Sequence, residues 1–238
     1  MLPLFLKLLH CLRNKGKKMR SFGGVSHLRV VIFDFDGTLA DTFSTVVSIV
    51  NSLAPRYGFH PLDIAAIASM RHLRAQDLLK VVRIPFWRIP SFLLEVKSVL
   101  GTQIEHVSPF PGIVPALESL HEKEYVLGIL TSNRRETVEL FLAHNAIILF
   151  DFVYSEKDLF GKARVLQNLM KQYQLSSEQV VYVGDETRDI EAAHHAGIRI
   201  VSVGWGFNSI RALEQAHPDI LIHKPHELVS AVESLFSK

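Results

Sequence analysis

The sequence has a single cysteine, Cys11, among its 238 residues. One thiol can form neither an internal disulfide nor a cysteine-based zinc site, and such scarcity is typical of a reducing compartment. A helix that spans a bilayer needs about 20 consecutive apolar residues, and the sequence has no such run. We therefore expect a cytoplasmic protein with no stable membrane association.

The sequence also has no large excess of positive or negative charge. The chain has 26 basic and 24 acidic side chains, which leave a formal net charge of +2. Much of the basic excess lies in the first 20 residues, so the rest of the chain has no basic surplus for a nucleic-acid groove. Apolar residues make up 48% and charged residues 21%, as in ordinary globular proteins. We expect a monomer or homodimer with no nucleic-acid partner.

The first 20 residues are apolar up to residue 12 and basic from residue 13. A secretory signal carries its basic residues before its apolar stretch, so the order here disfavours one. Two interpretations stay open: a short interfacial helix whose basic flank meets anionic lipid, and a disordered extension. Because Pro3 and the short length make a weak anchor, we favour a flexible basic extension over residues 1–26.

Residues 30–39, VVIFDFDGTL, join an unbroken apolar run to two acids, a glycine and a threonine. The apolar part is typical of a strand buried on both faces of a parallel sheet. Unpaired carboxylates are costly in a core, so Asp34 and Asp36 should follow the strand at its carboxyl end, where open α/β sheets bind ligands. Their mutual repulsion favours a hard divalent cation, Mg²⁺, between them. The alternative is that both acids merely end the strand and solvate a turn.

Strand patterns and helix patterns alternate along most of the chain. This alternation predicts an α/β fold with a Rossmann-like, doubly wound parallel sheet. The strand pattern disappears between about residues 54 and 107, where short helices are expected at residues 62–70, 75–82 and 91–100. An insertion at the carboxyl end of a strand overhangs the active face. We therefore predict a small, all-helical cap over residues 44–107 and a core formed by residues 27–43 and 108–238.

Basic residues of this insertion are candidates for contact with an anionic substrate, and a solvated helix face is the alternative for each. They are Arg71, His72, Arg74 and Lys80. The pattern of the cap alone does not identify the substrate.

Polar residues also follow later strands. Thr131, Ser132 and Asn133 end a second apolar strand, and GDETRD at residues 184–189 ends another. Lys162 opens the helix before that last strand. Because the carboxyl ends of parallel strands share one edge, these residues should converge with Asp34. Taken singly they have plain alternatives: Thr131 could cap a turn, Lys162 could be solvated, and the acids could favour a helix N-terminus.

Taken together and in this order, the motifs resemble those of the haloacid-dehalogenase-like hydrolases over about residues 28–238. DFDGTL at residues 34–39 matches the first motif, Thr131 the second, Lys162 the third and GDETRD the fourth. The expected helical cap and the glycine loop at residues 204–209 resemble the phosphoglycolate-phosphatase-like subfamily. The resemblance implies a phosphatase that acts on a small phosphorylated metabolite.

The resemblance also implies roles for the motif residues. Asp34 would attack phosphorus and form an aspartyl-phosphate, and Asp36 would act as general acid and then general base. The phosphoryl oxygens would be bound by Thr131 and Lys162, with Gly37, Ser132 and Asn133. The Mg²⁺ cofactor would be held by the Asp34 and Asp185 side chains and the Asp36 backbone carbonyl, and Glu186 and Asp189 would support this site.

Two other functions stay open. A β-phosphoglucomutase-like phosphomutase shares the chemistry but returns the phosphoryl group to a sugar. A non-catalytic regulatory protein on the same scaffold would be favoured by loss of a motif residue, and none is missing. A dehalogenase is disfavoured because Asp36 supplies an acid that halide departure does not need.

Deleting residues 1–26 should leave turnover unchanged, because the predicted site lies wholly in the later residues. Phosphate release by the full chain and by the truncated chain measures this. Sedimentation with anionic vesicles is the companion assay, and pelleting of the full chain but not of the truncation would establish the interfacial helix instead.

Overall fold

A computed structural model describes residues 28–63, 67, 71–72, 84–155 and 161–237. The predicted extension over residues 1–26 lies outside the described residues. So do the helix predicted at residues 75–82 and most of the one predicted at residues 62–70.

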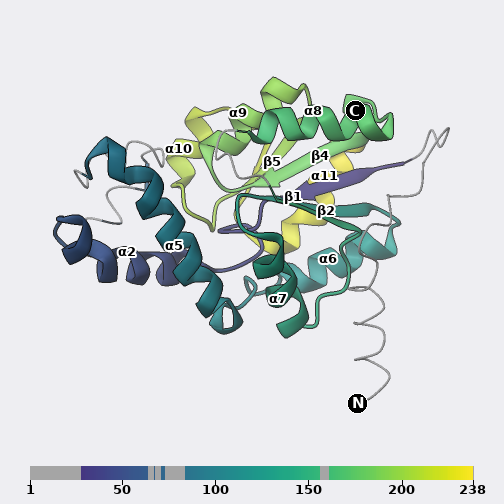
Figure 1. The fold of residues 1–238 in the computed structure, drawn as a ribbon. Coiled ribbons are helices and arrows are strands. Elements are labelled where there is room, and N and C mark those ends of the chain that lie inside the picture. The colour runs from purple at the N-terminus through teal and green to yellow at the C-terminus, as the bar shows by residue number, and fades with distance from the viewer. Residues whose placement is uncertain (1–27, 64–66, 68–70, 73–83, 156–160, 238) are drawn as a thin grey trace, which may run out of the picture.

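Six parallel strands form one sheet in the order β3-β2-β1-β4-β5-β6 (Figure 1). They are β1 (Val30–Phe33), β2 (Val126–Thr131), β3 (Phe152–Ser155), β4 (Val180–Gly184), β5 (Arg199–Val203) and β6 (Ile220–Ile222). The first strand lies in the middle, where all four of its side chains are fully buried. Because the strand order reverses at β1, a switch point lies beside its carboxyl end, the usual ligand position in such sheets.

Helices cover both faces of the sheet (Figure 1). One face packs against α6 (Ile113–Glu122), α7 (Arg135–His144) and α11 (Leu228–Phe236), and the other against α8 (Lys162–Tyr173), α9 (Thr187–Ala196) and α10 (Ile210–Gln215). Strand alternation divides β1 between them, with Val31 and Phe33 on the first side and Val30 and Ile32 on the second. The predicted Rossmann-like α/β fold is confirmed.

The interval after the first strand contains α2 (Phe43–Tyr57) and α5 (Ile89–Gln103), which lie side by side at one end of the sheet (Figure 1). They share a hydrophobic cluster of their own, which includes Leu53, Tyr57 and Phe92. We propose that this pair belongs to the predicted cap, whose boundary at residue 44 falls one residue inside α2.

Short 3₁₀ turns complete the described chain at Phe86–Arg88, Ile104–His106, Ser177–Gln179 and Pro225–Glu227. Of the helices in the described ranges, none combines the length and apolar character needed to cross a bilayer.

The phenyl ring of Phe141 in α7 is fully buried and makes an edge contact with Phe35, at 5.0 Å between ring centroids. Phe35 separates Asp34 from Asp36, so this contact supports the loop that carries both acids. Phe141→Ala should lower the free energy of unfolding by about 3–5 kcal/mol through lost burial and a cavity. Urea unfolding measures the loss.

Leu140→Ala is the matched control, since the neighbouring Leu140 is 41% exposed. It should change the free energy of unfolding by less than about 1 kcal/mol. Equal losses in the two variants would contradict the packing described here.

Candidate active site

Asp34 follows β1 directly and is only 3% exposed. Its backbone N–H donates to the Val183 carbonyl at 2.8 Å, which continues the pairing of β1 with β4. Its Oδ1 accepts the Phe35 N–H and its Oδ2 accepts the Lys162 ammonium, each at 2.8 Å. Burial raises the pKa of Asp34 to about 7, although the Lys162 charge opposes that rise.

Lys162 is the first residue of α8 and is 4% exposed, so the solvated alternative is wrong. Its Nζ also donates to Asp189 Oδ1 at 2.6 Å. Burial alone would lower the pKa of Lys162, but Asp189 and Asp34 together raise it well above its ordinary value. The other oxygen of Asp189 accepts the Glu186 N–H at 3.1 Å and so caps α9. Asp189 therefore fixes both the lysine and the start of α9.

Asp185 follows β4 and is fully buried. Its two oxygens each accept a hydrogen bond at 2.7 Å, Oδ1 from the Thr38 hydroxyl and Oδ2 from the Phe207 N–H. The Gly37 backbone passes so close that a Cβ there would lie 2.2 Å from Asp185 Oδ2, and its φ of 76° also favours glycine. Burial, followed by the neighbouring carboxylates, raises the pKa of Asp185 well above its usual range.

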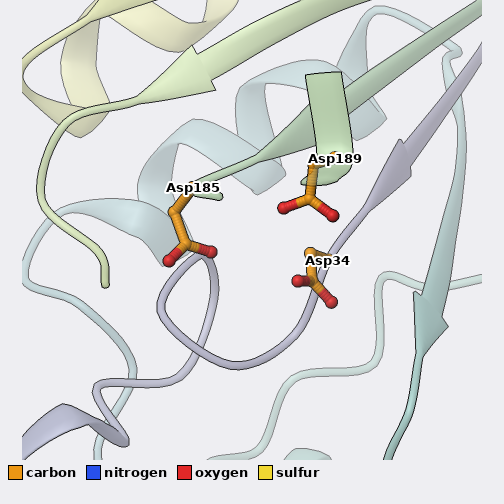
Figure 2. A group of neighbouring side chains, drawn as sticks. All are labelled: Asp34, Asp185 and Asp189. Atoms are coloured by element: carbon orange, nitrogen blue, oxygen red, sulfur yellow. The ribbon is translucent and has the colours of Figure 1, made fainter. Parts of the chain in front are cut away.

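Asp34, Asp185 and Asp189 each offer a carboxylate oxygen, and these atoms lie within 4.8 Å of one another. Figure 2 shows the three side chains converging from β1, from the end of β4 and from α9. Buried carboxylates that repel each other and offer only oxygen ligands suit a hard divalent cation.

The formal charges around these acids agree with that fit. In the described part of the chain, five carboxylates act on one another here against three cationic side chains, which leaves two negative charges in excess. The acids are Asp34, Asp36, Asp185, Glu186 and Asp189, and the bases are Lys97, Lys162 and Arg188. One divalent cation balances this excess.

The residues predicted at the end of the second strand, Thr131 to Asn133, lie at the carboxyl end of β2, and Asn133 contacts Asp36. The Asn133 side-chain amide donates to Asp36 Oδ2 at 2.7 Å, and the Asn133 backbone N–H donates to the Thr131 hydroxyl at 3.0 Å. The hydrogen bond from the Asn133 N–H to the Thr131 hydroxyl caps a turn, which was the alternative role for Thr131. The hydroxyl only accepts in this bond, so its own proton can still be donated. Burial raises the pKa of Asp36 to about 6, a value suited to proton transfer near neutral pH.

Two cations near these acids were missed by the sequence analysis. Arg188 donates from Nη2 to Glu186 Oε1 at 2.6 Å, and its charge acts on Asp34 and Asp36. Lys97 of α5 donates to the Ser132 carbonyl at 3.0 Å. Arg188 lies inside the fourth motif and so could have been singled out, but Lys97 is an isolated lysine in a helix pattern and gives no signal.

Arg71, a candidate for substrate contact, instead holds the loop at residues 204–209. Its Nε donates to the Phe207 carbonyl at 3.1 Å and its Nη2 donates to the Gly206 carbonyl. Its own carbonyl accepts the Ser209 N–H at 2.8 Å. Since Phe207 holds Asp185, Arg71 supports this acid indirectly. His72 is exposed, and Arg74 and Lys80 lie outside the described residues.

The family model for haloacid dehalogenase-like hydrolases matches residues 31–203, which include all four motifs. The chain belongs to this family. This family member is 37% identical over 209 residues to a phosphoglycolate phosphatase of Synechococcus elongatus, covering 87% of this chain and 99% of that relative. It is 24% identical to the pyrophosphatase PpaX of Oceanobacillus iheyensis, covering 88% and 99% of the two chains.

The fold of this hydrolase also matches solved structures. A predicted phosphatase from Clostridium acetobutylicum superposes with a TM-score of 0.75 at 18% identity, over 87% of this chain and 99% of that one. The predicted family, and with it the prediction of a hydrolytic enzyme, is confirmed.

If the excess negative charge is a cation site, Mg²⁺ should stabilise the hydrolase against heat. At a Mg²⁺ concentration about 100 times its Kd, the stabilisation should be about 2.7 kcal/mol, or a rise in melting temperature of roughly 5–10 °C. Thermal unfolding in Mg²⁺ and in a chelator measures the shift.

Asp185→Asn should lose this shift, whereas Asp41→Asn, a change at an exposed acid of the same loop as Gly37, should keep it. An unchanged response in Asp185→Asn would remove Asp185 from the metal site.

Proposed function

We propose that this hydrolase is a Mg²⁺-dependent phosphatase that cleaves a small phosphorylated metabolite through an aspartyl-phosphate on Asp34. The observation that carries the proposal is the buried cluster at the end of β1, where one lysine contacts two acids and a third acid lies within 4.8 Å. A relative at 37% identity is a phosphoglycolate phosphatase, which supports the same reaction class.

Asp34 is the proposed nucleophile. The Lys162 ammonium and the Phe35 N–H fix its carboxylate, and the lysine charge attracts the phosphoryl dianion that would otherwise repel it. The Thr131 hydroxyl offers a further donor, and we propose the Ser132 backbone as another. The predicted phosphate contact of the Gly37 N–H is not available here, because that group donates to the Ala40 carbonyl at 3.0 Å, and the Asn133 N–H donates to the Thr131 hydroxyl. The bond that forms joins Asp34 oxygen to phosphorus, and the bond that breaks joins phosphorus to the ester oxygen.

Mg²⁺ would be held by Asp34, Asp185 and the Asp36 backbone carbonyl, where it supplies charge neutralisation of the phosphoryl oxygens. Asp189 contacts the Lys162 ammonium at 2.6 Å and caps α9 through the Glu186 N–H, so we propose that it positions the lysine. Glu186 pairs with Arg188 at 2.6 Å and supports the same end of the site.

Asp36 is the proposed general acid and base. With a pKa raised to about 6 it can give its proton to the departing alkoxide oxygen, and the Asn133 amide keeps its carboxyl group in place. The ionised Asp36 then takes a proton from water, which attacks the aspartyl-phosphate, releases inorganic phosphate and restores both acids.

Substrate choice is not fixed by family membership. The relatives described above include a phosphoglycolate phosphatase and a pyrophosphatase. We propose that the cytoplasmic substrate is a small ester chosen by residues of α2, α5 and the neighbouring segments.

Asp34→Asn should lower kcat by at least about 1,000-fold with every phosphate ester that the wild type hydrolyses, because it removes the nucleophile. A screen of phosphorylated metabolites in Mg²⁺, read as released phosphate, measures this. Asp41→Asn, at the exposed acid of the same loop, is the control and should match the wild type.

Equal phosphate release by the wild type and Asp34→Asn would refute the nucleophile assignment. Phosphoryl return to a second sugar hydroxyl, without free phosphate, would establish the phosphomutase instead. Turnover of no compound would favour the regulatory protein.

A further inference from the structure

Lys97 brings a positive charge from α5 to the edge of the active site. It is half-buried, and its Nζ donates to the Ser132 carbonyl at 3.0 Å. Ser132 is flanked by Thr131 and by Asn133, whose amide binds Asp36 at 2.7 Å. A short chain of contacts therefore joins this lysine to the proposed acid.

The charge of Lys97 is not matched by an acid. Within the described ranges it forms no salt bridge, and its one hydrogen bond uses a single N–H of the three on the ammonium. Burial lowers the pKa of Lys97, the nearby Arg188 lowers it further, and only Asp36 opposes them. Holding a cation in this position costs free energy that a bound anion would recover.

Arg188 places a second cation near Lys97. Its Nη2 is paired with Glu186, but its Nε is buried and has no hydrogen-bond partner in the described part of the structure. Lys97 and Arg188 are near enough to repel each other, and both feel the Asp36 charge. Arg188 is balanced by acids, so within the described structure Lys97 is the cation of this pair that has no ion-pair partner and can take an anion.

The transferred phosphoryl group does not need this place, because Asp34 and Lys162 already define where phosphorus binds. Asp36 is the proposed proton donor to the ester oxygen that leaves, so this oxygen should lie beside it. A substrate group near both Asp36 and Lys97 therefore belongs to the leaving alcohol and not to the phosphoryl group. We propose that Lys97, assisted by Arg188, selects esters whose leaving group carries its own negative charge, a carboxylate or a second phosphate. This inference rests on the proposed phosphatase function.

The test compares two esters of equal chain length, 2-phosphoglycolate and 2-hydroxyethyl phosphate, which carry a carboxylate and a neutral hydroxyl. The wild type should prefer the anionic ester in kcat/KM. Lys97→Met keeps the aliphatic stem and removes the charge, so the ratio of the two kcat/KM values should fall about 10- to 100-fold, mainly through KM for the anionic ester. Lys97→Arg should restore most of the ratio.

Lys171→Met, at an exposed lysine of α8, is the matched control and should keep the wild-type ratio. Pyrophosphate is the third substrate. If Lys97→Met lowers kcat/KM for pyrophosphate but not for 2-phosphoglycolate, each relative to the neutral ester, the anionic group that Lys97 recognises is a second phosphate. Equal losses on charged and neutral substrates would show that Lys97 is only structural and would overturn the proposal.

p-Nitrophenyl phosphate separates this inference from the proposed function. One outcome is that the wild type hydrolyses p-nitrophenyl phosphate, Asp34→Asn does not, and the wild type shows no preference for the charged esters. This outcome would refute the role of Lys97 but would support the phosphatase function. Failure to hydrolyse p-nitrophenyl phosphate or any of the other esters would remove both.

Discussion

Lys162 contacts two buried carboxylates at once, Asp34 at 2.8 Å and Asp189 at 2.6 Å, and the rest of the site is arranged around this bridge. Burial favours the neutral carboxyl group of Asp34, and the lysine charge opposes that effect by lowering the pKa of this acid. One lysine cannot also neutralise Asp185. The remaining charge is what makes the cluster suitable for a divalent cation and then for a phosphate dianion.

The sheet makes this concentration of charge possible. Asp34 follows β1 and Asp185 follows β4, and these strands are neighbours although about 150 residues of sequence separate them. The burial of β1 on both faces holds the backbone at the start of the acid loop, while Phe35 packs away from the site against Phe141. The acids are therefore fixed by the hydrophobic core beneath them.

The segments beyond the sheet are tied to the same acids. Arg71 holds the backbone of the loop whose Phe207 N–H binds Asp185, and Lys97 holds the Ser132 carbonyl next to Asn133 and Asp36. Contacts of this kind allow residues outside the core to influence both Asp185 and Asp36. Selectivity for the leaving group would follow from the same arrangement, because the charge that recognises it is carried on α5.

Much of the fold could be predicted from local pattern. The apolar run predicted to be a buried strand before Asp34 is β1, and the polar residues predicted to end two later strands lie at the carboxyl ends of β2 and β4. Apolar runs and helical periodicity are local properties, and the convergence of strand ends follows from parallel topology. The position of Lys162 at the first residue of α8 agrees with the prediction for the same reason.

Sequence by itself determined the family, the order of the strands and helices, and which acids end the strands, because each depends on residues that are adjacent in the chain. Only the tertiary structure decided the partners of those acids: Thr38 on Asp185, Asn133 on Asp36, and Lys97 on the Ser132 carbonyl. Each of these contacts joins segments at least 35 residues apart. An isolated lysine in an amphipathic helix has no local property that distinguishes a substrate contact from a solvated side chain, so its place became visible only when α5 was packed against the sheet.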